Sequence, residues 1–199
     1  MAKKKYAILI LAAGGSKRLG HPKQLVKWNQ STLLNHTLEQ ALSSNNSDVY
    51  VALGGNHSVI KHTISLGVSI IDIPDWEDGM GTSISVSLNE MKVKKYEAII
   101  ISVCDQPYIS EVVFKNLLAE FERGKSSIVI SKYKNSSGPP TLFGKKHYDR
   151  LLKLEGDVGA KEIVKNNLVE VGIIQFQKGD IDIDTEKDLR SLLELKEGF

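Results

Sequence analysis

Apolar runs alternate with segments of helical periodicity along almost the whole chain. Residues 6–12 form a nearly continuous apolar run that ends at Gly14-Gly15, a pattern typical of a strand buried on both faces of a sheet. Similar runs predict further strands at 48–53, 68–73, 98–103, 127–131 and 169–176. Apolar residues spaced three and four apart predict helices at 32–42, 57–65, 82–91, 110–121, 145–152, 160–166 and 185–195.

This order of elements predicts one α/β domain that spans residues 1–199. Strands separated by helices join through right-handed crossovers, which produce a mainly parallel sheet with helices on both faces. We therefore expect a three-layer sandwich of the Rossmann-like type, in which ligands bind beyond the carboxyl ends of the strands. The segments in that position are 13–23, 74–83, 105–107 and 182–184.

Composition and charge narrow the classes of partner. The chain has 199 residues, of which 41% are hydrophobic and 25% charged, as in ordinary globular proteins. Its net charge of +2 is too small to indicate binding to nucleic acid or to an acidic membrane, and no apolar stretch approaches the roughly 20 residues that span a bilayer. The N-terminal residues lack a signal-peptide cleavage pattern, and the single cysteine, Cys104, excludes an intramolecular disulfide. We expect a cytoplasmic protein that acts on small molecules.

The loop after the first strand combines small residues with two cations. Small residues let the backbone approach a polyphosphate closely, so that its N–H groups can bind phosphate oxygens. Arg18 offers a fork of donors and Lys23 a point charge to the same phosphates. The spacing excludes the G-x-x-x-x-G-K-[ST] and G-x-G-x-x-G loops, but a simple turn, or a dinucleotide or flavin site, is an alternative at this point. The residues expected to contact the nucleotide are Leu11, Ala12, Ala13, Gly14, Gly15, Ser16, Arg18 and Lys23.

Acidic residues follow two other apolar stretches. Asp105 comes just after the predicted strand 98–103, where a carboxylate beside a triphosphate is a natural ligand for Mg²⁺; a turn that begins with Asp-x-Pro is the alternative. Asp182 and Asp184 would face the same side of an extended segment. We favour Asp182 as the second metal ligand, because Asp184 could instead cap the predicted helix at 185–195, whose start also resembles a capping box.

Three of these segments together resemble a known family. The sequence LAAGGSKRLG, followed by Pro22-Lys23, is similar to the opening signature of the MobA-like nucleotidyltransferases, which attach CMP or GMP to molybdopterin. Asp105-Gln106-Pro107 and the segment DIDTEKDL at 182–189 resemble two further motifs of the branch that uses CTP. The resemblance implies the fold of the nucleotide-diphospho-sugar transferases, and Mg²⁺-dependent transfer of CMP from CTP to the phosphate of molybdopterin with release of pyrophosphate.

The same resemblance assigns roles to individual residues. It makes Arg18, Lys23 and Asp105 catalytic, and it gives the metal to Asp105 together with Asp182 or Asp184. Ala13 in Leu-Ala-Ala-Gly and Gln106 in Asp-Gln-Pro point toward CTP, although a single methyl group discriminates between bases by only about 1–3 kcal/mol. A molybdoenzyme or its chaperone is the protein partner that the resemblance implies.

The acceptor side of the site rests on three more motifs, which are less complete. Segment 75–83 resembles W-x-x-G-M-x-x-S and adds Gly79 and Ser83 to the nucleotide contacts, with Trp76 as either a packing or a stacking residue. Segments 137–143 and 156–161 resemble R-G-x-P-x-L-F and G-D-x-G-A-R, but Ser137, Pro139 and Lys161 replace the family's arginine, histidine and arginine. A sugar or alditol phosphate as acceptor, or a non-catalytic accessory protein that binds the cofactor, is therefore an alternative. The acceptor contacts expected are Trp76, Met80, Gln106, Pro107, Gly138, Pro140, Asp157 and Lys161.

Overall fold

Seven strands form the central sheet of the computed structural model, which describes residues 5–44, 47–64 and 67–197. In chain order they are β1 (Tyr6–Ala12), β4 (Ser47–Leu53), β5 (Ser69–Asp72), β6 (Ala98–Val103), β7 (Ile128–Lys132), β8 (Ser137–Gly144) and β9 (Val171–Gln175). Across the sheet the order is β5-β4-β1-β6-β8-β7-β9; β8 runs antiparallel to both of its neighbours, and the other pairs are parallel. The mainly parallel sheet predicted from the sequence is confirmed.

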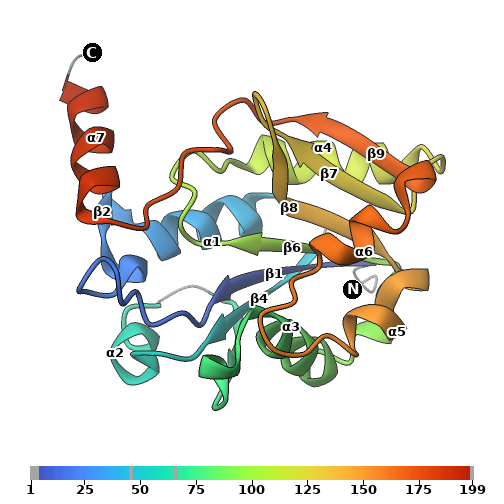
Figure 1. The fold of residues 1–199 in the computed structure, drawn as a ribbon, viewed down its shortest axis with the longest axis horizontal. Helices are drawn as coiled ribbons and strands as arrows, with labels where there is room; N and C mark the ends of the chain where they lie inside the picture. The colour runs from blue at the N-terminus through green and yellow to red at the C-terminus, as the bar shows by residue number, and fades with distance from the viewer. Residues whose placement is uncertain (1–4, 45–46, 65–66, 198–199) are drawn as a thin grey trace.

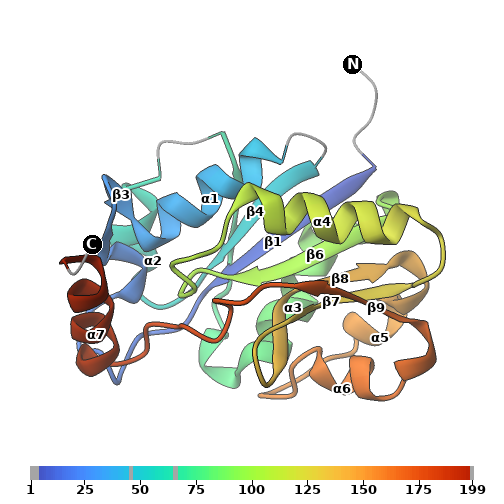
Figure 2. The same cartoon turned by 90° about the horizontal axis from the view of Figure 1, so that it is seen from above.

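Helices cover both faces of this sheet, as Figures 1 and 2 show. The helices on one face are α1 (Leu33–Ser43) and α4 (Glu111–Glu122), and those on the other are α3 (Met80–Glu90), α5 (Tyr148–Leu151) and α6 (Lys161–Lys165). The other elements include α2 (His57–Lys61), α7 (Glu186–Glu197) and a hairpin of β2 (Lys27–Trp28) and β3 (Ser31–Thr32). This is the expected three-layer α/β architecture. None of the described helices is long and apolar enough to cross a membrane.

The central strand β1 shows why its sequence is apolar at every position. Ile8 and Ile10 face the core under α1 and α4, whereas Ala7 and Leu9 face the core under α3 and α5, and all four are fully buried. Burial of a leucine or isoleucine side chain contributes roughly 1.5–3 kcal/mol relative to exposure. Both faces of β1 are thus fixed by packing, so the loop that follows β1 starts from a rigid point at the carboxyl edge of the sheet.

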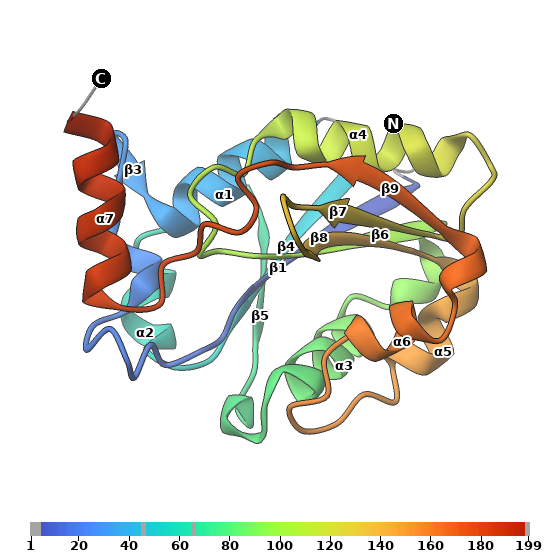
Figure 3. The ribbon, with the colours of Figure 1, turned by 45° about the horizontal axis from the view of Figure 1, so that its top comes forward.

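A smaller core fastens the C-terminal helix to that loop. Leu19 from the loop packs with Trp28 of the hairpin and with Ile183 and Leu192 from the C-terminal segment. Figure 3 shows α7 beside the blue segment that follows β1, at the opposite end of the view from α6. Segments from the two ends of the chain therefore meet at the carboxyl edge of the sheet.

The structure differs from the sequence-based elements mainly at their ends and in one strand. Helix 57–65 is shorter, because α2 ends at Lys61, and residue 65 lies outside the described residues. The predicted helix at 145–152 begins with a 3₁₀ turn, Lys145–His147. Strand β8 was not predicted, because Gly138, Pro139 and Pro140 at its start are typical of a loop. Proline does occur at the start of a strand, and the β7–β8 pairing shifts register just there, between Ile130 and Ser131.

Candidate functional site

A cleft of about 970 Å³ opens at the carboxyl ends of β1 and β6. One side is formed by the loop after β1, by the residues that follow β6 and by the segment before α7. The other side is formed by the start of α3, the start of β8 and the start of α6. These are the places where the topology brings the four segments expected from the sequence to one edge.

A buried glutamine shapes the loop after β1. Nε2 of Gln24 donates to the carbonyl oxygens of Ala12, at 2.7 Å, and Gly14, at 3.0 Å, and the side chain is only 1% exposed. The backbone N–H of Lys23 donates to Oγ of Ser16 at 3.0 Å, and Ser16 itself has a positive φ of 53°. The loop therefore folds back on itself around Gln24. Gln24 was not predicted as a site residue, because its only signal in the sequence is an amide next to Lys23.

Trp76 is packed against the glycines of the cleft wall. A Cβ atom added at Gly15 would lie 2.6 Å from Cη2 of the Trp76 ring, and one at Gly54 would lie 2.4 Å from Cβ of Trp76. No side chain fits at either glycine without displacing the indole. Trp76 also lines the cleft, and its contacts with the two glycines show the packing role that the sequence left open.

An ion-pair network joins the first loop to the two acidic segments. Nζ of Lys23 lies 2.9 Å from Oδ2 of Asp105 and also pairs with Oδ1 of Asp184. Nη2 of Arg18 lies 2.7 Å from Oδ2 of the same Asp184. Asp105 follows β6, which pairs directly with β1, and this adjacency brings the carboxylate to the loop. Both oxygens of Asp184 are thus bound by cations of the first loop.

The network shifts the acidity of its members in opposite directions. Burial disfavours the charged form of Lys23, but the neighbouring Asp105 and Asp184 outweigh it and raise the pKa of the ammonium. Burial also acts to raise the pKa of Asp184, yet bonds from Lys23 and Arg18 hold this pKa below its usual value. For Asp182, partial burial and the charges of Asp105 and Asp184 raise the pKa. For Asp182 the charge of Lys23 acts in the opposite direction, but it does not outweigh burial and the two neighbouring carboxylates.

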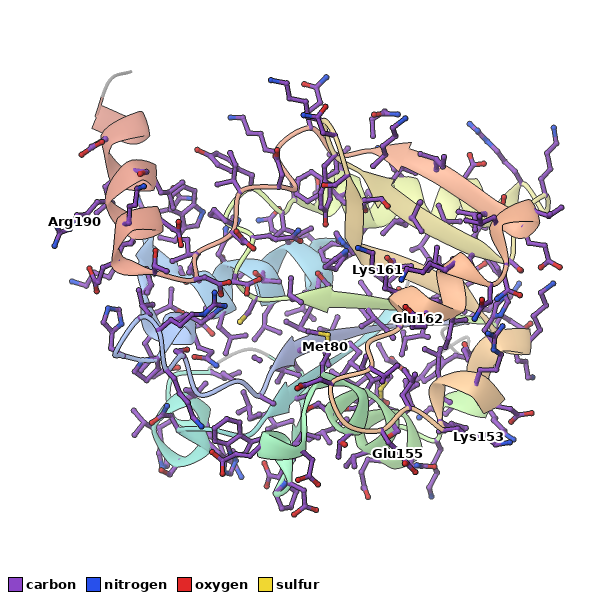
Figure 4. All side chains as sticks on the ribbon, in the orientation of Figure 1. Met80, Lys153, Glu155, Lys161, Glu162 and Arg190 are labelled. Atoms are coloured by element: carbon purple, nitrogen blue, oxygen red, sulfur yellow. The ribbon has the colours of Figure 1, made fainter. Side chains whose placement is uncertain are left out.

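The start of α3 is held close to the loop that precedes α6. Gly79 has a φ of 120°, and a Cβ atom there would lie 2.4 Å from Oδ1 of Asp157. The N–H of Gly81 donates to the carbonyl of Gly156 at 2.7 Å, and the N–H of Gly156 donates to Oγ1 of Thr82 at 3.1 Å. These contacts place Asp157 beside the start of α3, and Met80 and Lys161, both labelled in Figure 4, line the same cleft.

Gln106 joins the residues after β6 to the start of β8 and to the segment before α7. Its Nε2 donates to the carbonyl oxygens of Gly179, at 2.7 Å, and Pro139, at 3.1 Å, and lies 2.9 Å from the hydroxyl of Tyr133. Burial raises the pKa of Tyr133 to about 12, so its hydroxyl stays protonated and donates to the carbonyl of Pro139. Two carbonyl acceptors fix the orientation of the Gln106 amide. They leave its buried Oε1 without a hydrogen-bond partner among the described residues.

Comparison with known proteins assigns the chain to a family. Residues 8–171 match the family described as the MobA-like NTP transferase domain. The chain belongs to this family. It is therefore a nucleotidyltransferase of the MobA-like type, as the signature of its first loop indicated.

Curated relatives of this MobA-like chain carry different names. It is 26% identical over 191 residues to the purine catabolism protein PucB of Bacillus subtilis, covering 90% of this chain and 92% of the relative. It is 27% identical to nicotine blue oxidoreductase of Paenarthrobacter nicotinovorans, covering 93% and 95%. A probable molybdenum cofactor guanylyltransferase of Bacillus cereus is 31% identical over 129 residues, covering 63% and 61%. The three relatives carry three different functional names, so these names alone do not give the reaction of this chain.

Solved structures agree with the MobA-like fold over the full chain. Rv0371c of Mycobacterium tuberculosis superposes with a TM-score of 0.85 at 28% identity, covering 98% of this chain and 100% of that one. A complex of the same mycobacterial protein with manganese gives a TM-score of 0.80 at 25% identity, covering 96% and 98%. The single Rossmann-like sandwich predicted from the sequence is confirmed.

The acidic cluster of this MobA-like chain fits a hard divalent cation. Mg²⁺ binds through one or two protein carboxylates and keeps water and phosphate oxygens in its other positions. Asp105 and Asp182 both line the cleft, and Asp182 has a raised pKa that a cation would lower. Among the described residues, no three acidic, histidine or cysteine side chains are grouped closely enough to hold a metal ion by themselves.

The cap of α7 is not the one expected for Asp184. Oδ2 of Asp188 accepts from the N–H of Thr185 at 2.8 Å, and the N–H of Asp188 lies 3.3 Å from Oγ1 of Thr185. This reciprocal pair is the capping box, and it is confirmed. The interpretation of the Asp184 side chain as the helix cap is wrong, because Lys23 and Arg18 bind both of its carboxylate oxygens.

Most of the residues expected from the sequence come together in the cleft. Those that line it are Leu11, Ala12, Ala13, Gly14, Gly15, Ser16, Arg18, Lys23, Trp76, Gly79, Met80, Ser83, Asp105, Gln106, Gly138, Asp157, Lys161, Asp182 and Asp184. Pro107 and Pro140 are buried and stand behind this lining, with Pro139 on the cleft side instead. Cys104 also touches the cleft, but it is 3% exposed and burial raises the pKa of its thiol, so it is a core residue rather than a nucleophile.

Proposed function

We propose that this MobA-like enzyme transfers CMP from CTP to the terminal phosphate of molybdopterin in a Mg²⁺-dependent reaction. An oxygen of the acceptor phosphate attacks the α-phosphorus of CTP, the bond between this phosphorus and the bridging α,β-oxygen breaks, and pyrophosphate leaves. The observation that carries the proposal is the network of Lys23 with Asp105 and Asp184 beside a loop that can hold a triphosphate.

The residues of the first loop would bind the triphosphate and stabilise the leaving group. Backbone N–H groups of the loop would approach the phosphates, since the small residues there leave the backbone accessible. Arg18 and Lys23 would neutralise the charge that grows on pyrophosphate, the role of preorganised donors in phosphoryl transfer. The acceptor phosphate is already ionised at neutral pH, so the reaction needs no general base.

Asp105 and Asp182 would hold the magnesium ion of this reaction. Bound there, Mg²⁺ supplies positive charge to the phosphate oxygens in the transition state. Both carboxylates lie at the cleft, and a cation would favour the ionised form of Asp182, whose pKa is raised by partial burial and by its acidic neighbours. Asp184 is assigned to Lys23 and Arg18 instead, since they bind both of its oxygens.

Apolar side chains in the cleft support molybdopterin rather than a sugar phosphate as the acceptor. Four apolar residues, Ile101, Ile130, Phe143 and Val164, line the cleft. A flat heteroaromatic ring gains more from such a surface than a polyhydroxylated sugar, whose hydroxyl groups would lose their water without replacement. Lys161 makes no ion pair within the described part of the chain, so it is available to the acceptor phosphate. A molybdoenzyme or its chaperone would then receive the product.

Pyrophosphate release tests the substrate directly. The protein is mixed with Mg²⁺, with CTP, GTP or ATP, and with molybdopterin, a hexose 1-phosphate or an alditol phosphate as acceptor. We expect release with CTP and molybdopterin, and a kcat/KM at least about tenfold lower with GTP, the lower end of what one methyl group can discriminate. Release with a sugar or alditol phosphate alone would overturn the acceptor assignment. Nucleotide binding without turnover for every acceptor would instead favour the accessory protein.

A further inference from the structure

The acidic cluster beside the first loop contains a cation that belongs to the protein. The ammonium of Lys23 lies between Asp105 and Asp184, 2.9 Å from Oδ2 of the former. The Lys23 side chain is 16% exposed, against 21% for Asp105 and 27% for Asp184. Because all three groups are largely shielded from water, their attraction is stronger than that of a surface pair.

A divalent metal and this ammonium need the same carboxylate. Metal–oxygen distances for Mg²⁺ are about 2.0–2.1 Å, so a metal bound to Asp105 would stand within a few ångströms of the Lys23 Nζ, which already bonds that carboxylate. Two cations so close together in a shielded site repel each other strongly. The metal therefore gains Asp105 fully only when Lys23 moves away from it.

Asp184 can keep the Lys23 ammonium bound while Asp105 exchanges Lys23 for the metal. It binds Lys23 through Oδ1 and Arg18 through Oδ2. It follows β9 in sequence and precedes α7, whose Leu192 packs against Leu19 of the first loop. A carboxylate anchored in this way keeps both cations beside the loop, ready for triphosphate oxygens, whether or not Asp105 is engaged.

We propose that Lys23 is the resident counter-cation of the metal site and competes with the divalent metal for Asp105. In the nucleotide-free protein Lys23 stays bound to Asp105, and the metal therefore binds weakly. When the nucleotide binds, oxygens of its triphosphate accept the hydrogen bonds of the Lys23 ammonium in place of Asp105. The Asp105 carboxylate is then free to bind the metal, so that metal and nucleotide bind together. The inference rests on the metal role of Asp105 in the proposed function, but on neither CTP nor molybdopterin.

Metal binding without nucleotide tests the competition. Mn²⁺ is titrated into the nucleotide-free protein, and the free ion is followed by its electron paramagnetic resonance signal. We expect Lys23→Met to bind Mn²⁺ about tenfold more tightly than the unchanged protein, because a shielded positive charge beside the ligand is removed. Lys23→Arg keeps the charge and should stay within about threefold of the unchanged protein. Lys115→Met, which removes a lysine from an exposed helical pair with Glu111, should bind Mn²⁺ unchanged.

Two results would overturn the proposal. The first is Mn²⁺ affinity that is unchanged or weaker in Lys23→Met and in the second variant, Lys23→Gln, with thermal unfolding showing that each is folded. The second is Mn²⁺ binding by the double variant Lys23→Met with Asp105→Asn that equals binding by Lys23→Met, because the metal would then sit elsewhere. If the affinity rises as expected while CTP and molybdopterin give no pyrophosphate, the competition stands and the substrate assignment fails.

Discussion

Two buried glutamines hold the two sides of the cleft, and they do so in different surroundings. Gln24 binds the carbonyl oxygens of Ala12 and Gly14 on the phosphate side. Gln106 binds those of Pro139 and Gly179 on the acceptor side. The phosphate side adds a network of charged groups to this amide, whereas the hydrogen-bond partners of Gln106 are all neutral. The first side is therefore organised to balance charge and the second to fix shape.

This difference separates what each side responds to. Ion pairs in the phosphate side weaken when a partner loses its charge, and the exposed ones weaken with salt as well. The neutral contacts around Gln106 do not depend on ionisation near neutral pH, because Tyr133 titrates only at a pKa of about 12. Charge-changing substitutions should hence affect nucleotide and metal steps, and shape-changing ones should affect the acceptor step and stability.

The largest expected effect comes from the charged side. Asp105→Asn keeps the shape of the side chain but removes its charge from the metal site. We expect kcat/KM for pyrophosphate release to fall about 10²–10³-fold, the usual cost of losing one preorganised electrostatic group. Asp78→Asn, an exposed residue outside the cleft lining, is the matched control and should change kcat/KM by less than about twofold. A loss below about tenfold for Asp105→Asn would mean that the charged side does not carry the chemistry.

The glutamines themselves give the next effect. Gln24→Leu leaves the carbonyl oxygens of Ala12 and Gly14 without this donor. Gln106→Leu leaves that of Gly179 without it, whereas Tyr133 still donates to Pro139. Each variant should lower the free energy of unfolding by about 1–3 kcal/mol in urea denaturation. Their effects on ligands should differ. Gln24→Leu should weaken nucleotide binding severalfold, whereas Gln106→Leu should leave nucleotide affinity unchanged and raise KM for the acceptor. Equal loss of nucleotide affinity in both variants would break the division between the two sides.

The same division explains what the sequence could predict. Nucleotide-side residues follow strands β1 and β6, whose apolar runs are unmistakable, and the loop after β1 carries a sequence that resembles the opening signature of the family. Parallel pairing then brings Lys23 and Asp105 to one edge by topology alone. The identity of this half of the site was therefore accessible before any coordinates.

The acceptor side was less accessible, because its contacts depend on packing between distant segments. Strand β8 has Gly138, Pro139 and Pro140 near its start, so its pattern is that of a loop. The hydrogen bond from Gln106 to Gly179 joins residues 73 positions apart, and no local pattern predicts it. The role of Asp184 was likewise hidden, since the choice between cap, metal ligand and ion-pair partner depends on where Arg18 and Lys23 point.

A third, smaller effect concerns the departure from the family motif on the acceptor side. Ser137→Arg restores a guanidinium at an exposed position that lines the cleft. We expect KM for a phosphate acceptor to fall about fivefold, near the upper limit for an exposed ion pair. Ser136→Arg, one residue earlier, has the same charge and also lines the cleft. An equal fall in both variants would indicate general charge attraction rather than a defined phosphate contact.

The smallest effect concerns Asp182 and Asp184, whose ionised carboxylates should change the stability of the fold in opposite directions. Asp184 has a pKa below its ordinary value of 3.8, so its ionised form stabilises the fold above that pH, and this contribution is lost as the pH falls through the lowered pKa. Asp182 has a raised pKa, so its ionised form costs stability, and this cost disappears as the pH falls through the raised pKa.

Thermal unfolding of the metal-free protein at pH 7 should therefore show opposite shifts. Asp184→Asn should lower Tm, because it leaves Lys23 and Arg18 with one partner fewer, whereas Asp182→Asn should raise it, because the variant removes a carboxylate repelled by Asp105 and Asp184. The gain from Asp182→Asn should vanish once the pH lies well below 3.8, where the native carboxyl is protonated as well. Added Mn²⁺ should then stabilise the unchanged protein more than Asp182→Asn. A carboxylate that binds the metal would in this way destabilise the metal-free protein and stabilise the metal-bound protein. If both variants shifted Tm in the same direction at pH 7, the two carboxylates would share one role, and the separation of metal ligand from ion-pair partner would fail.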